Sequence, residues 1–395
     1  MTTRIGVDVT TLANGRGFGR FTREVLTAML PISSDAEWVL FADARAEAAA
    51  QAIAVTASRA RVIVVPQSVS PTVAAAADGN RSPIDMLRLT RAVYRERLDA
   101  FFSPAVYGFF PTPPGLPLLA CLHDAIAERF PEMTLPTARA RLFWRLKSRL
   151  ALAQSRLILT VSDYSARDLA RFYGIAPSRI RVALEAPSSA YHPSDDLAAI
   201  RASAVRQGVP DGAPWFVYVG GFNPHKHVDV VVGAHAKVVA ETGRAVHLLL
   251  VGALTDVFHE SIASIRQRIE HEGTASLVHW AGFVADDELR FLLSGAVASV
   301  LVSECEGFGL PAVEAAACGT PVIATTESPL PQLLPNGGHF VAPRDEQAVA
   351  NAMTRLLVDP GHRATCARAA LSGAQRLSWA RTAAITWQAI QDVAA

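Results

Sequence analysis

The chain has 395 residues, half of them hydrophobic and 18% charged, and its formal net charge at pH 7 is +1. This length and composition predict a globular protein of about two domains, and the near-neutral charge gives no basis for a nucleic-acid partner. Apolar runs stay well below the roughly 18 residues of a membrane span, and no signal-peptide pattern precedes the first predicted strand. The four cysteines lack metal-ligand spacing and suit reduced thiols in the cytoplasm.

The first predicted strand, residues 5–9, leads into a glycine-bearing segment and then into a helical pattern over residues 21–30. Glycines in such a segment allow close approach of the backbone to a ligand and place N–H groups at a positive helix end. Their spacing differs from G-x-G-x-x-G, so a turn that needs glycine only for its geometry is the alternative. The glycines are Gly15, Gly17 and Gly19.

Further strands of the first half alternate with alanine-rich helical stretches, which predicts a parallel sheet with helices on both faces. His123 and Asp124 follow the strand at 118–122, at its carboxyl end. A histidine held by hydrogen bonds for structural reasons is the alternative to a functional one, and Asp124 suits either orienting His123 or capping the next segment. Residues 71–83 are predicted to be a loop. The strands are predicted at residues 38–41, 62–65, 100–102, 118–122 and 157–161.

A predicted helix over residues 139–156 combines a leucine and phenylalanine stripe with several basic side chains. Such a face suits anionic lipid or a charged acceptor, so peripheral contact with a membrane is one interpretation. A solvated surface around an ordinary core stripe is the other. The basic residues are Arg139, Arg141, Arg145, Lys147, Arg149 and Arg156.

The second half begins after a segment rich in Pro, Ser, Asp and Gly, residues 185–214, which predicts a connection between two domains. A strand at 215–219 then runs into a loop that carries Lys226. A lysine there is a suitable counter-charge for a diphosphate, with an ordinary surface lysine as the alternative. His225 and His227 have no third ligand nearby in the sequence, so no metal site is predicted.

The strand predicted at residues 296–302 leads into a turn that carries two carboxylates. Glu306 lies in the loop at the carboxyl end of the strand, where open α/β sheets bind ligands. Glu314 is predicted in the first turn of the next helix, with Pro311 at the first helical position. The pair suits a polyol, and backbone N–H groups of the turn suit an anion. The alternative is an acidic helix N-terminus stabilised by the helix dipole. Other strands are predicted at 247–251, 278–280, 320–324 and 339–341, and helix at 348–395.

The segment EGFGLPxxEAxAxGxPVIA, which holds Glu306 and Glu314 in an E-x7-E arrangement, resembles the signature of the retaining glycosyltransferases of family GT4. The resemblance implies an α/β protein of GT-B fold, with two Rossmann-like α/β/α domains facing across a cleft. It implies an acceptor-binding domain at residues 1–190, a nucleotide-sugar-binding domain at 191–378, and a last helix at 379–395 that packs back on the first domain.

In that family the first glutamate contacts the donor sugar and the second contacts the ribose of the nucleotide. The loop with Lys226 resembles the family's GxxxPRKN, with Lys226 on the phosphate-binding lysine and His225 in place of the arginine. His123 is expected beside the donor sugar. The resemblance implies His123, Glu306 and Lys226 as catalytic residues. The implied donor and substrate contacts are Gly17, Phe18, Gly19, Asp124, Gly221, His225, Phe283, Val284, Gly307, Phe308, Gly309, Leu310 and Glu314.

The predicted function is transfer of a hexose from a nucleotide diphosphate sugar, of GDP-mannose or UDP-sugar type, to a glycan, lipid-linked or small-molecule acceptor. The resemblance alone implies retention of anomeric configuration, with Glu306 as a sugar binder and not a covalent nucleophile. The sequence has no D-x-D, so neither a metal nor a cofactor is expected, and Lys226 and helix N-termini meet the departing charge.

Three other functions stay open: a sugar phosphorylase, a nucleotide-sugar epimerase, and a non-catalytic binding protein of GT-B fold. Two α/β units would also suit a dinucleotide oxidoreductase. That class is disfavoured because the sequence has no G-x-G-x-x-G.

Overall fold

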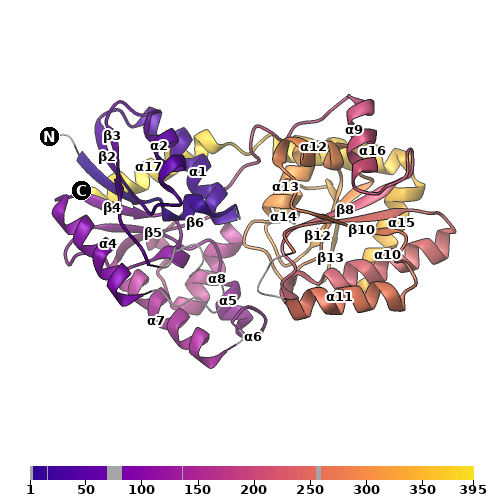
Figure 1. The fold of residues 1–395 in the computed structure, drawn as a ribbon, viewed down its shortest axis with the longest axis horizontal. Coiled ribbons are helices and arrows are strands. Elements are labelled where there is room, and N and C mark those ends of the chain that lie inside the picture. The colour runs from indigo at the N-terminus through magenta and orange to yellow at the C-terminus, as the bar shows by residue number, and fades with distance from the viewer. Residues whose placement is uncertain (1–2, 16, 69–81, 136, 255–258) are drawn as a thin grey trace. The chain divides into compact units, whose positions relative to one another are not determined.

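The chain divides into two compact α/β units, described in a computed structural model for residues 3–15, 17–68, 82–135, 137–254 and 259–395. Unit 1 comprises Met1–Glu185 and Ser378–Ala395, and unit 2 comprises Ala186–Leu377. In each unit a parallel sheet lies between layers of helices (Figure 1), which is the Rossmann-like architecture that the sequence predicts. Most of the predicted loop at 71–83 lies outside the described residues, as does Arg16 of the glycine segment.

Within the described residues, the sheet of unit 1 has seven parallel strands in the order β3-β2-β1-β4-β5-β6-β7. Every residue of β4 and β5 is buried, as expected for a parallel sheet covered by helices on both faces. The strand order reverses between β1 and β4, which makes the carboxyl ends of these strands a switch point. The strands are β1 (Thr3–Asp8), β2 (Ala36–Ala42), β3 (Ala60–Val64), β4 (Ala100–Ser103), β5 (Leu118–Cys121), β6 (Ser155–Thr160) and β7 (Ile180–Val182).

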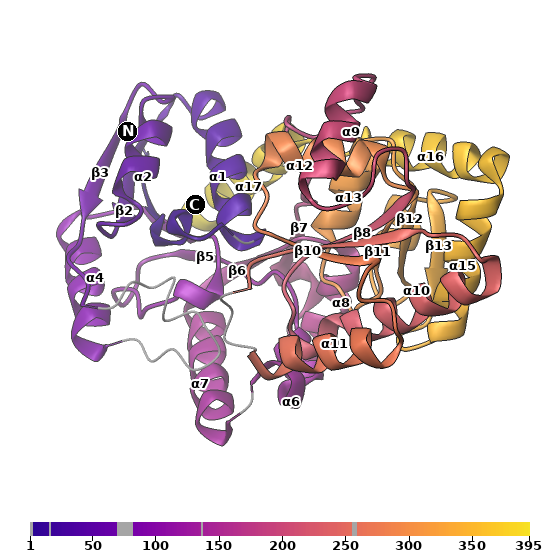
Figure 2. The same ribbon diagram turned by 45° about the vertical axis from the view of Figure 1, so that its right-hand side comes forward.

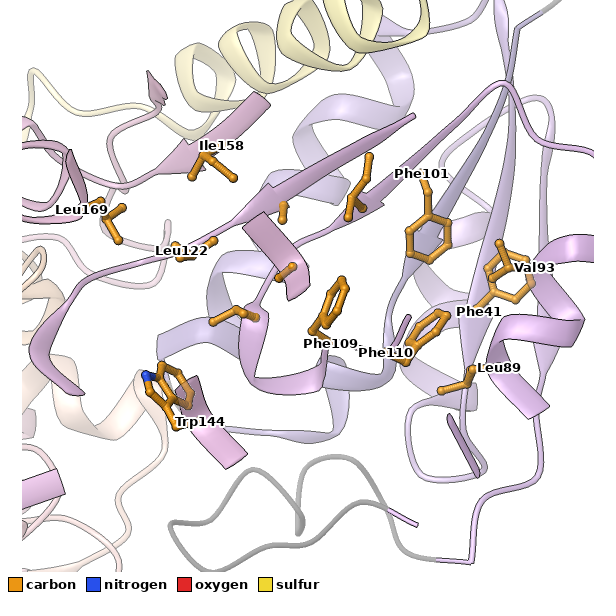
Figure 3. Close-up of a cluster of buried hydrophobic side chains, with 14 of the residues drawn as sticks. Phe41, Leu89, Val93, Phe101, Phe109, Phe110, Leu122, Trp144, Ile158 and Leu169 are labelled. Atoms are coloured by element: carbon orange, nitrogen blue, oxygen red, sulfur yellow. The ribbon is translucent and has the colours of Figure 1, made fainter. Parts of the chain in front are cut away.

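The helices of unit 1 cover both faces of its sheet, and the end of the chain supplies one of them. The rings of Trp387 and Trp38 lie 5.6 Å apart, and Arg156 donates to the carbonyl oxygen of Val393 at 2.7 Å. On the other face, α4 and α7 share one apolar cluster with β4 and β5, which Figure 3 shows below the sheet and opposite α17. The helices are α1 (Gly17–Met29), α2 (Glu47–Ala54), α4 (Pro83–Arg95), α5 (Ile126–Arg129), α6 (Pro131–Thr134), α7 (Ala138–Gln154), α8 (Asp163–Tyr173) and α17 (Trp379–Ala394).

Unit 2 has a parallel sheet of order β10-β9-β8-β11-β12-β13, with its switch point between β8 and β11. Its strands are β8 (Trp215–Val219), β9 (His247–Val251), β10 (Val278–Gly282), β11 (Ala298–Leu301), β12 (Val322–Thr325) and β13 (Gly338–Val341). Its helices are α9 (Leu197–Arg206), α10 (Val228–Thr242), α11 (His259–His271), α12 (Asp286–Gly295), α13 (Leu310–Ala317), α14 (Leu330–Leu333), α15 (Glu346–Val358) and α16 (Pro360–Ala374). Among all the described residues, no helix has both the length and the apolar content that crossing a membrane requires.

Several helix boundaries differ from the sequence prediction, and the end of the chain, predicted as helix over 348–395, forms the three separate helices α15, α16 and α17. Helix α1 begins at Gly17, so the predicted glycine loop is partly the first turn of a helix. Helix α13 begins at Leu310, which places Pro311 second in the helix and Glu314 beyond the first turn. The predicted basic helix ends at Gln154, because Ser155 begins strand β6 and pairs with β5, so Arg156 belongs to the strand.

Candidate functional site

An ion pair joins the loops that follow β8 and β11, the two strands at the switch point of unit 2. Lys226 Nζ lies 2.7 Å from Glu306 Oε1, and the hydroxyl of Ser303 donates to the same carboxylate oxygen at 2.5 Å. The two charged side chains are only 18% and 10% exposed. The fold therefore brings two motifs 80 residues apart into contact at the edge of the sheet where such folds bind ligands.

A left-handed glycine turns the chain from Glu306 into helix α13. Gly309 has φ 86° and is the N-cap of the helix, and a Cβ there would lie 2.7 Å from Leu330 Cδ1. The neighbouring motif residues Gly307, Phe308 and Leu310 are buried, and Glu314 is 4% exposed on the same helix. The positive end of α13 therefore lies in the same loop as the Lys226–Glu306 pair, which suits an anionic ligand.

His225 precedes Lys226 and is buried, with 7% of its surface exposed. Burial, and then the charges of Lys226 and His227, lower the pKa of His225 well below its ordinary value. The ring is therefore neutral at neutral pH and supplies no cation where the resembling family has an arginine.

A second carboxylate of the same loop, Glu304, belongs to a cluster that the sequence analysis missed. Its Oε2 contacts His227 Nε2 at 2.6 Å and Arg344 Nε at 2.8 Å. Burial opposes ionisation, but the hydrogen bonds from His227 and Arg344 lower the pKa of Glu304. The cluster ties together the loops after β8, β11 and β13. Within the described part of the chain, no group of three or more His, Cys, Asp or Glu side chains is arranged to hold a metal ion.

The ends of β8, β9 and β10 approach each other through glycines. The N–H of Gly252 donates to the carbonyl of Gly282 at 2.9 Å, and a Cβ on Gly252 would lie 2.0 Å from the carbonyl oxygen of Gly220. Beyond this junction Phe283 is 78% exposed, whereas Val284 is buried. Gly221 follows Gly220 in the chain, and the carbonyl of Gly221 accepts a hydrogen bond from the buried Tyr218 hydroxyl.

In unit 1, His123 is held at both ring nitrogens. Nε2 lies 3.0 Å from the carbonyl oxygen of Pro104, and Nδ1 lies 3.4 Å from Glu185 Oε1. Burial disfavours the charged ring, yet the side chains of Cys121 and Glu185 raise the pKa of His123 well above its ordinary value. Contacts with a carbonyl oxygen and a carboxylate therefore favour the protonated form of the His123 ring. No sequence signal singled out Glu185, which begins the segment predicted to connect the domains, because the short strand β7 just before it was not predicted.

Asp124 caps the segment after His123. Its Oδ1 accepts a hydrogen bond from the N–H of Ile126 at 2.9 Å, which opens the short helix α5. This was one of the two functions that the sequence left open for Asp124.

The glycine segment near the start of the chain is only partly explained by packing. A Cβ on Gly19 would lie 1.9 Å from the carbonyl oxygen of Asn14, so close packing at the start of α1 requires glycine there. Among the described residues, no atom lies within 4 Å of a Cβ added to Gly15 or Gly17. The ring of Phe18, between the last two glycines, stacks on Tyr107 at 5.1 Å. Contact among the described residues of unit 1 therefore accounts for Gly19 and gives no packing reason for Gly15 or Gly17.

Two Rossmann-like units, with a lysine–glutamate pair at a switch point and an E-x7-E motif, define a member of the GT-B glycosyltransferase class. Two family profiles match the chain: "Glycosyltransferase Family 4" at residues 17–183 and "Glycosyl transferases group 1" at residues 200–372. Together the two profiles span most of the sequence. The chain belongs to the family 4 glycosyltransferases, as its motifs indicate.

Two curated relatives illustrate the range of the family. O-antigen chain mannosyltransferase B of Escherichia coli is 28% identical over 229 residues, which are 58% of this chain and 58% of that protein. D-inositol 3-phosphate glycosyltransferase 2 of Catenulispora acidiphila is 30% identical over 285 residues, which are 69% of this chain and 64% of that protein. The chain thus matches less than two thirds of the length of either relative.

Solved structures share the fold over nearly the whole chain. Anabaena Alr3699/HepE in complex with UDP and glucose has a TM-score of 0.74 at 19% identity, covering 99% of this chain and 100% of that one. Sucrose-phosphate synthase from Thermosynechococcus elongatus has a TM-score of 0.76 at 18% identity, covering 99% and 98%. At these identities the similarity shows the GT-B fold alone.

Proposed function

We propose that this protein transfers a hexose from a nucleotide diphosphate sugar to an acceptor hydroxyl, with retention of anomeric configuration. The observation that carries the proposal is the Lys226–Glu306 pair at the switch point of unit 2, 2.7 Å apart and mostly buried. A fixed cation suits the diphosphate, and a carboxylate beside it suits a sugar hydroxyl. The names of two relatives, a mannosyltransferase and an inositol phosphate glycosyltransferase, support sugar transfer, and we propose GDP-mannose or a UDP-sugar as the donor.

In this proposal unit 2 holds the donor. Lys226 and the N-terminal turn of α13, with residues 307–310, bind the diphosphate, and Glu314 binds the ribose. The chain around Phe283 and Val284 frames the base. Ser303 and Lys226 both contact Oε1 of Glu306, so we assign its Oε2 to a hydroxyl of the donor sugar.

The same pair accounts for departure of the nucleotide. As the bond between sugar and diphosphate breaks, negative charge grows on the leaving phosphate, and Lys226 meets that charge without a metal ion. The acceptor oxygen attacks from the face that the nucleotide leaves, and a phosphate oxygen takes the acceptor proton. Glu306 orients the sugar and forms no covalent bond with it.

Residues 1–190 are assigned to the acceptor, a glycan, a lipid-linked sugar or a small polyol, with Gly17, Phe18, Gly19 and Asp124 among its contacts. We also assign His123 to catalysis beside the donor sugar, where the protonated ring that its contacts with Pro104 and Glu185 favour would supply positive charge. The four cysteines are free and buried, which suits the reducing cytoplasm as the place of action.

The first experiment is a thermal-shift screen against UDP, GDP, ADP and their sugars, because a ligand that binds the folded state raises its apparent stability. For the nucleotide that binds, Lys226→Ala should lower affinity by roughly 10- to 100-fold, the worth of a hydrogen bond to a charged group. Glu314→Ala should lower the affinity for the nucleotide and for the nucleotide sugar to the same extent. Lys237→Ala is the matched control, since Lys237 is a half-exposed lysine of α10 that pairs with Glu346. Unchanged affinity in both Lys226→Ala and Glu314→Ala would show that the donor site is wrongly assigned.

Product analysis then separates transfer from the rival functions. A phosphorylase would need inorganic phosphate for turnover, an epimerase would convert the sugar without an acceptor, and a binding protein would bind the donor and leave it intact. Transfer to an added acceptor, with the anomeric configuration of the donor retained in the product by NMR, is the result we expect.

A further inference from the structure

Helix α7 leaves an apolar stripe exposed to solvent. Leu142, Phe143, Leu146 and Leu150 are exposed by 57%, 50%, 57% and 40%. Three of them recur every four residues, and Phe143 adjoins this row, so all four lie on one side of the helix. The other side, which includes Trp144, packs into the core of unit 1. An exposed row of large apolar side chains on the outer side of a packed helix indicates a contact surface.

Arginines border this stripe. Arg141, Arg145 and Arg149 recur every four residues along one edge of it, and Arg139 lies in line with the leucines. Lys147 points inward instead, with Nζ 4.7 Å from the Trp144 ring and 3.2 Å from the carbonyl oxygen of Tyr107. The helix carries five basic residues and no acidic residue. Its outer face is therefore both apolar and strongly positive.

Helix α4 repeats the pattern. Ile84, Leu87 and Tyr94 are exposed by 62%, 67% and 71%. Its one acidic residue, Asp85, is buried and contacts Arg88 at 2.9 Å. Its three basic residues are Arg88, Arg91 and Arg95.

The two helices cover the same face of the sheet of unit 1. Leu89 of α4 and Trp144 of α7 belong to one apolar cluster below that face (Figure 3). The chain after β4 fixes both helices, since Thr90 of α4 donates to the carbonyl of Pro111 at 2.6 Å and Gln154 of α7 donates to the carbonyl of Thr112 at 3.1 Å. In Figures 1 and 2 the two helices lie on the same side of unit 1. Both helices therefore turn their outer sides away from the same face of the sheet, and we call these two outer sides together the α4–α7 face.

We infer that the α4–α7 face docks unit 1 on an anionic lipid bilayer. The chain as a whole has a net charge of +1, so the excess of basic residues on these two helices is a local feature that calls for an anionic partner. A soluble polyanion would pair with the arginines but would leave the leucines in water. The interface of a bilayer takes up both, because the leucines enter the acyl boundary while the arginines stay at the lipid phosphates. The inference goes beyond the proposed function and does not depend on it.

Vesicle co-sedimentation of the full chain tests the inference. We expect binding to vesicles of phosphatidylcholine mixed with phosphatidylglycerol, and binding weaker by about tenfold or more to phosphatidylcholine alone and at high salt. The double variants Leu142→Gln/Leu146→Gln and Arg145→Gln/Arg149→Gln should each weaken binding to the mixed vesicles by about tenfold or more. All four side chains are exposed or at the surface, so these changes leave the core of unit 1 intact.

A matched control lies on α9 of unit 2. Leu197 is 65% exposed and Arg201 is also exposed, so Leu197→Gln/Arg201→Gln makes the same chemical changes off the face and should bind vesicles like the wild-type chain. A Leu146→Cys chain labelled with an environment-sensitive dye gives a second measurement, because the four native cysteines are buried. Its emission should shift to the blue when mixed vesicles are added.

Three results would overturn the inference. The first is no co-sedimentation of the wild-type chain and no dye shift. The second is an equal loss of binding in the α9 control. The third is loss in the arginine variant with full binding in the leucine variant, which would make the face an electrostatic site for a soluble polyanion such as heparin.

Discussion

His123 contacts a hydrogen-bond acceptor at each ring nitrogen, and one of them is a buried carboxylate, Glu185, which is 4% exposed. A histidine with raised pKa in the folded state adds stability below its unfolded pKa, and that stability is lost as the pH rises through the folded pKa. Cys121 and Glu185 therefore both favour the protonated ring inside the protein, and Glu185 is the one of the two that is a carboxylate. Its effect should be greatest in mildly acidic and neutral solution.

The test at this scale is Glu185→Gln, which keeps the shape of the side chain and removes its charge. We expect unit 1 to lose about 1.5–3 kcal/mol at about pH 6, the worth of a hydrogen bond between charged groups, and less at alkaline pH, where the wild-type ring also loses its proton. NMR titration of the His123 ring should show its pKa lowered relative to the wild-type chain.

Asp124→Asn provides the control for Glu185→Gln, because it neutralises the carboxylate next to His123 in sequence, which caps the start of α5. If Asp124→Asn lowers the pKa of His123 as strongly as Glu185→Gln, the carboxylate that charges the ring has been misidentified. Turnover measured with both variants would then show whether the charge of His123 also serves transfer.

At the scale of the element, the start of α13 depends on one backbone conformation. Gly309 has φ 86°, and a Cβ added to it would lie 2.7 Å from the Leu330 side chain. The motif needs glycine here because a side chain would both strain the backbone and push on a buried leucine. The conformation of Gly309 thereby fixes the direction of α13 and the position of Glu306, which precedes the helix.

Gly309→Ala should destabilise unit 2 by about 3 kcal/mol, the sum of left-handed strain and overpacking. Gly212→Ala is the matched control, since Gly212 has φ 75° and no atom of the described residues lies within 4 Å of a Cβ added there. It should cost only the strain, about 1 kcal/mol. Urea unfolding gives both values, and nucleotide affinity should fall for Gly309→Ala alone. If the two substitutions lower the free energy of unfolding equally, the contact with Leu330 does not contribute to the cost of Gly309→Ala.

The sequence predicted the elements best where an apolar run is sharply bounded. Strands β8 and β9 agree residue for residue with the predicted 215–219 and 247–251, because a glycine, Gly220 or Gly252, follows each run. Strand β7 was missed because three residues give too short a pattern, and the strand exists through its pairing with β6. The end of α7 was placed too late because Arg156 continues the basic spacing of the helix, whereas pairing of β6 with β5 decides its conformation.

The same limit applies to the candidate site. Lys226 and Glu306 stand in recognisable motifs, so the sequence singled out both residues, and the structure adds their contact. Glu185, Glu304 and Arg344 lie in no motif, and His227 stands at the last position of the GxxxPRKN-like loop with no predicted role. The loops that carry their partners come together only when the sheets form, so the spacing of residues in the sequence does not predict these contacts.

At the scale of the whole molecule, the two units share a sheet order and differ in how their buried groups respond to acid. In unit 1, burial raises the pKa of Glu128, and Cys121 and Glu185 raise that of His123 against the effect of burial. In unit 2, burial lowers the pKa of several histidines, and His235 falls to about 4. These histidines are His225, His235, His247, His279 and His339.

A histidine with a lowered pKa adds full stability above its unfolded pKa of 6.5, and the stability is lost as the pH falls below that value. A histidine that stays unprotonated in the folded state, such as His235, lowers the free energy of unfolding by about 1.4 kcal/mol at about pH 5.5. Acid should therefore weaken unit 2 before unit 1, where a raised pKa acts in the opposite direction. Hydrogen exchange measures the stability of each unit separately when it is followed on peptides of β9 and of β5. The measurement is made at about pH 7.5 and 5.5, with the rates corrected for intrinsic exchange.

His235→Gln isolates one contribution, because the amide can still donate to the carbonyl of Val246, as His235 Nε2 does at 2.8 Å, and takes up no proton. That variant should recover about 1.4 kcal/mol of the acid loss in unit 2. His271→Gln, at a side chain 82% exposed, should recover none. If β5 loses protection as early as β9 when the pH falls, the histidines of unit 2 do not set the acid limit. The shared fold of the two units would then govern their stability more than the buried groups that distinguish them.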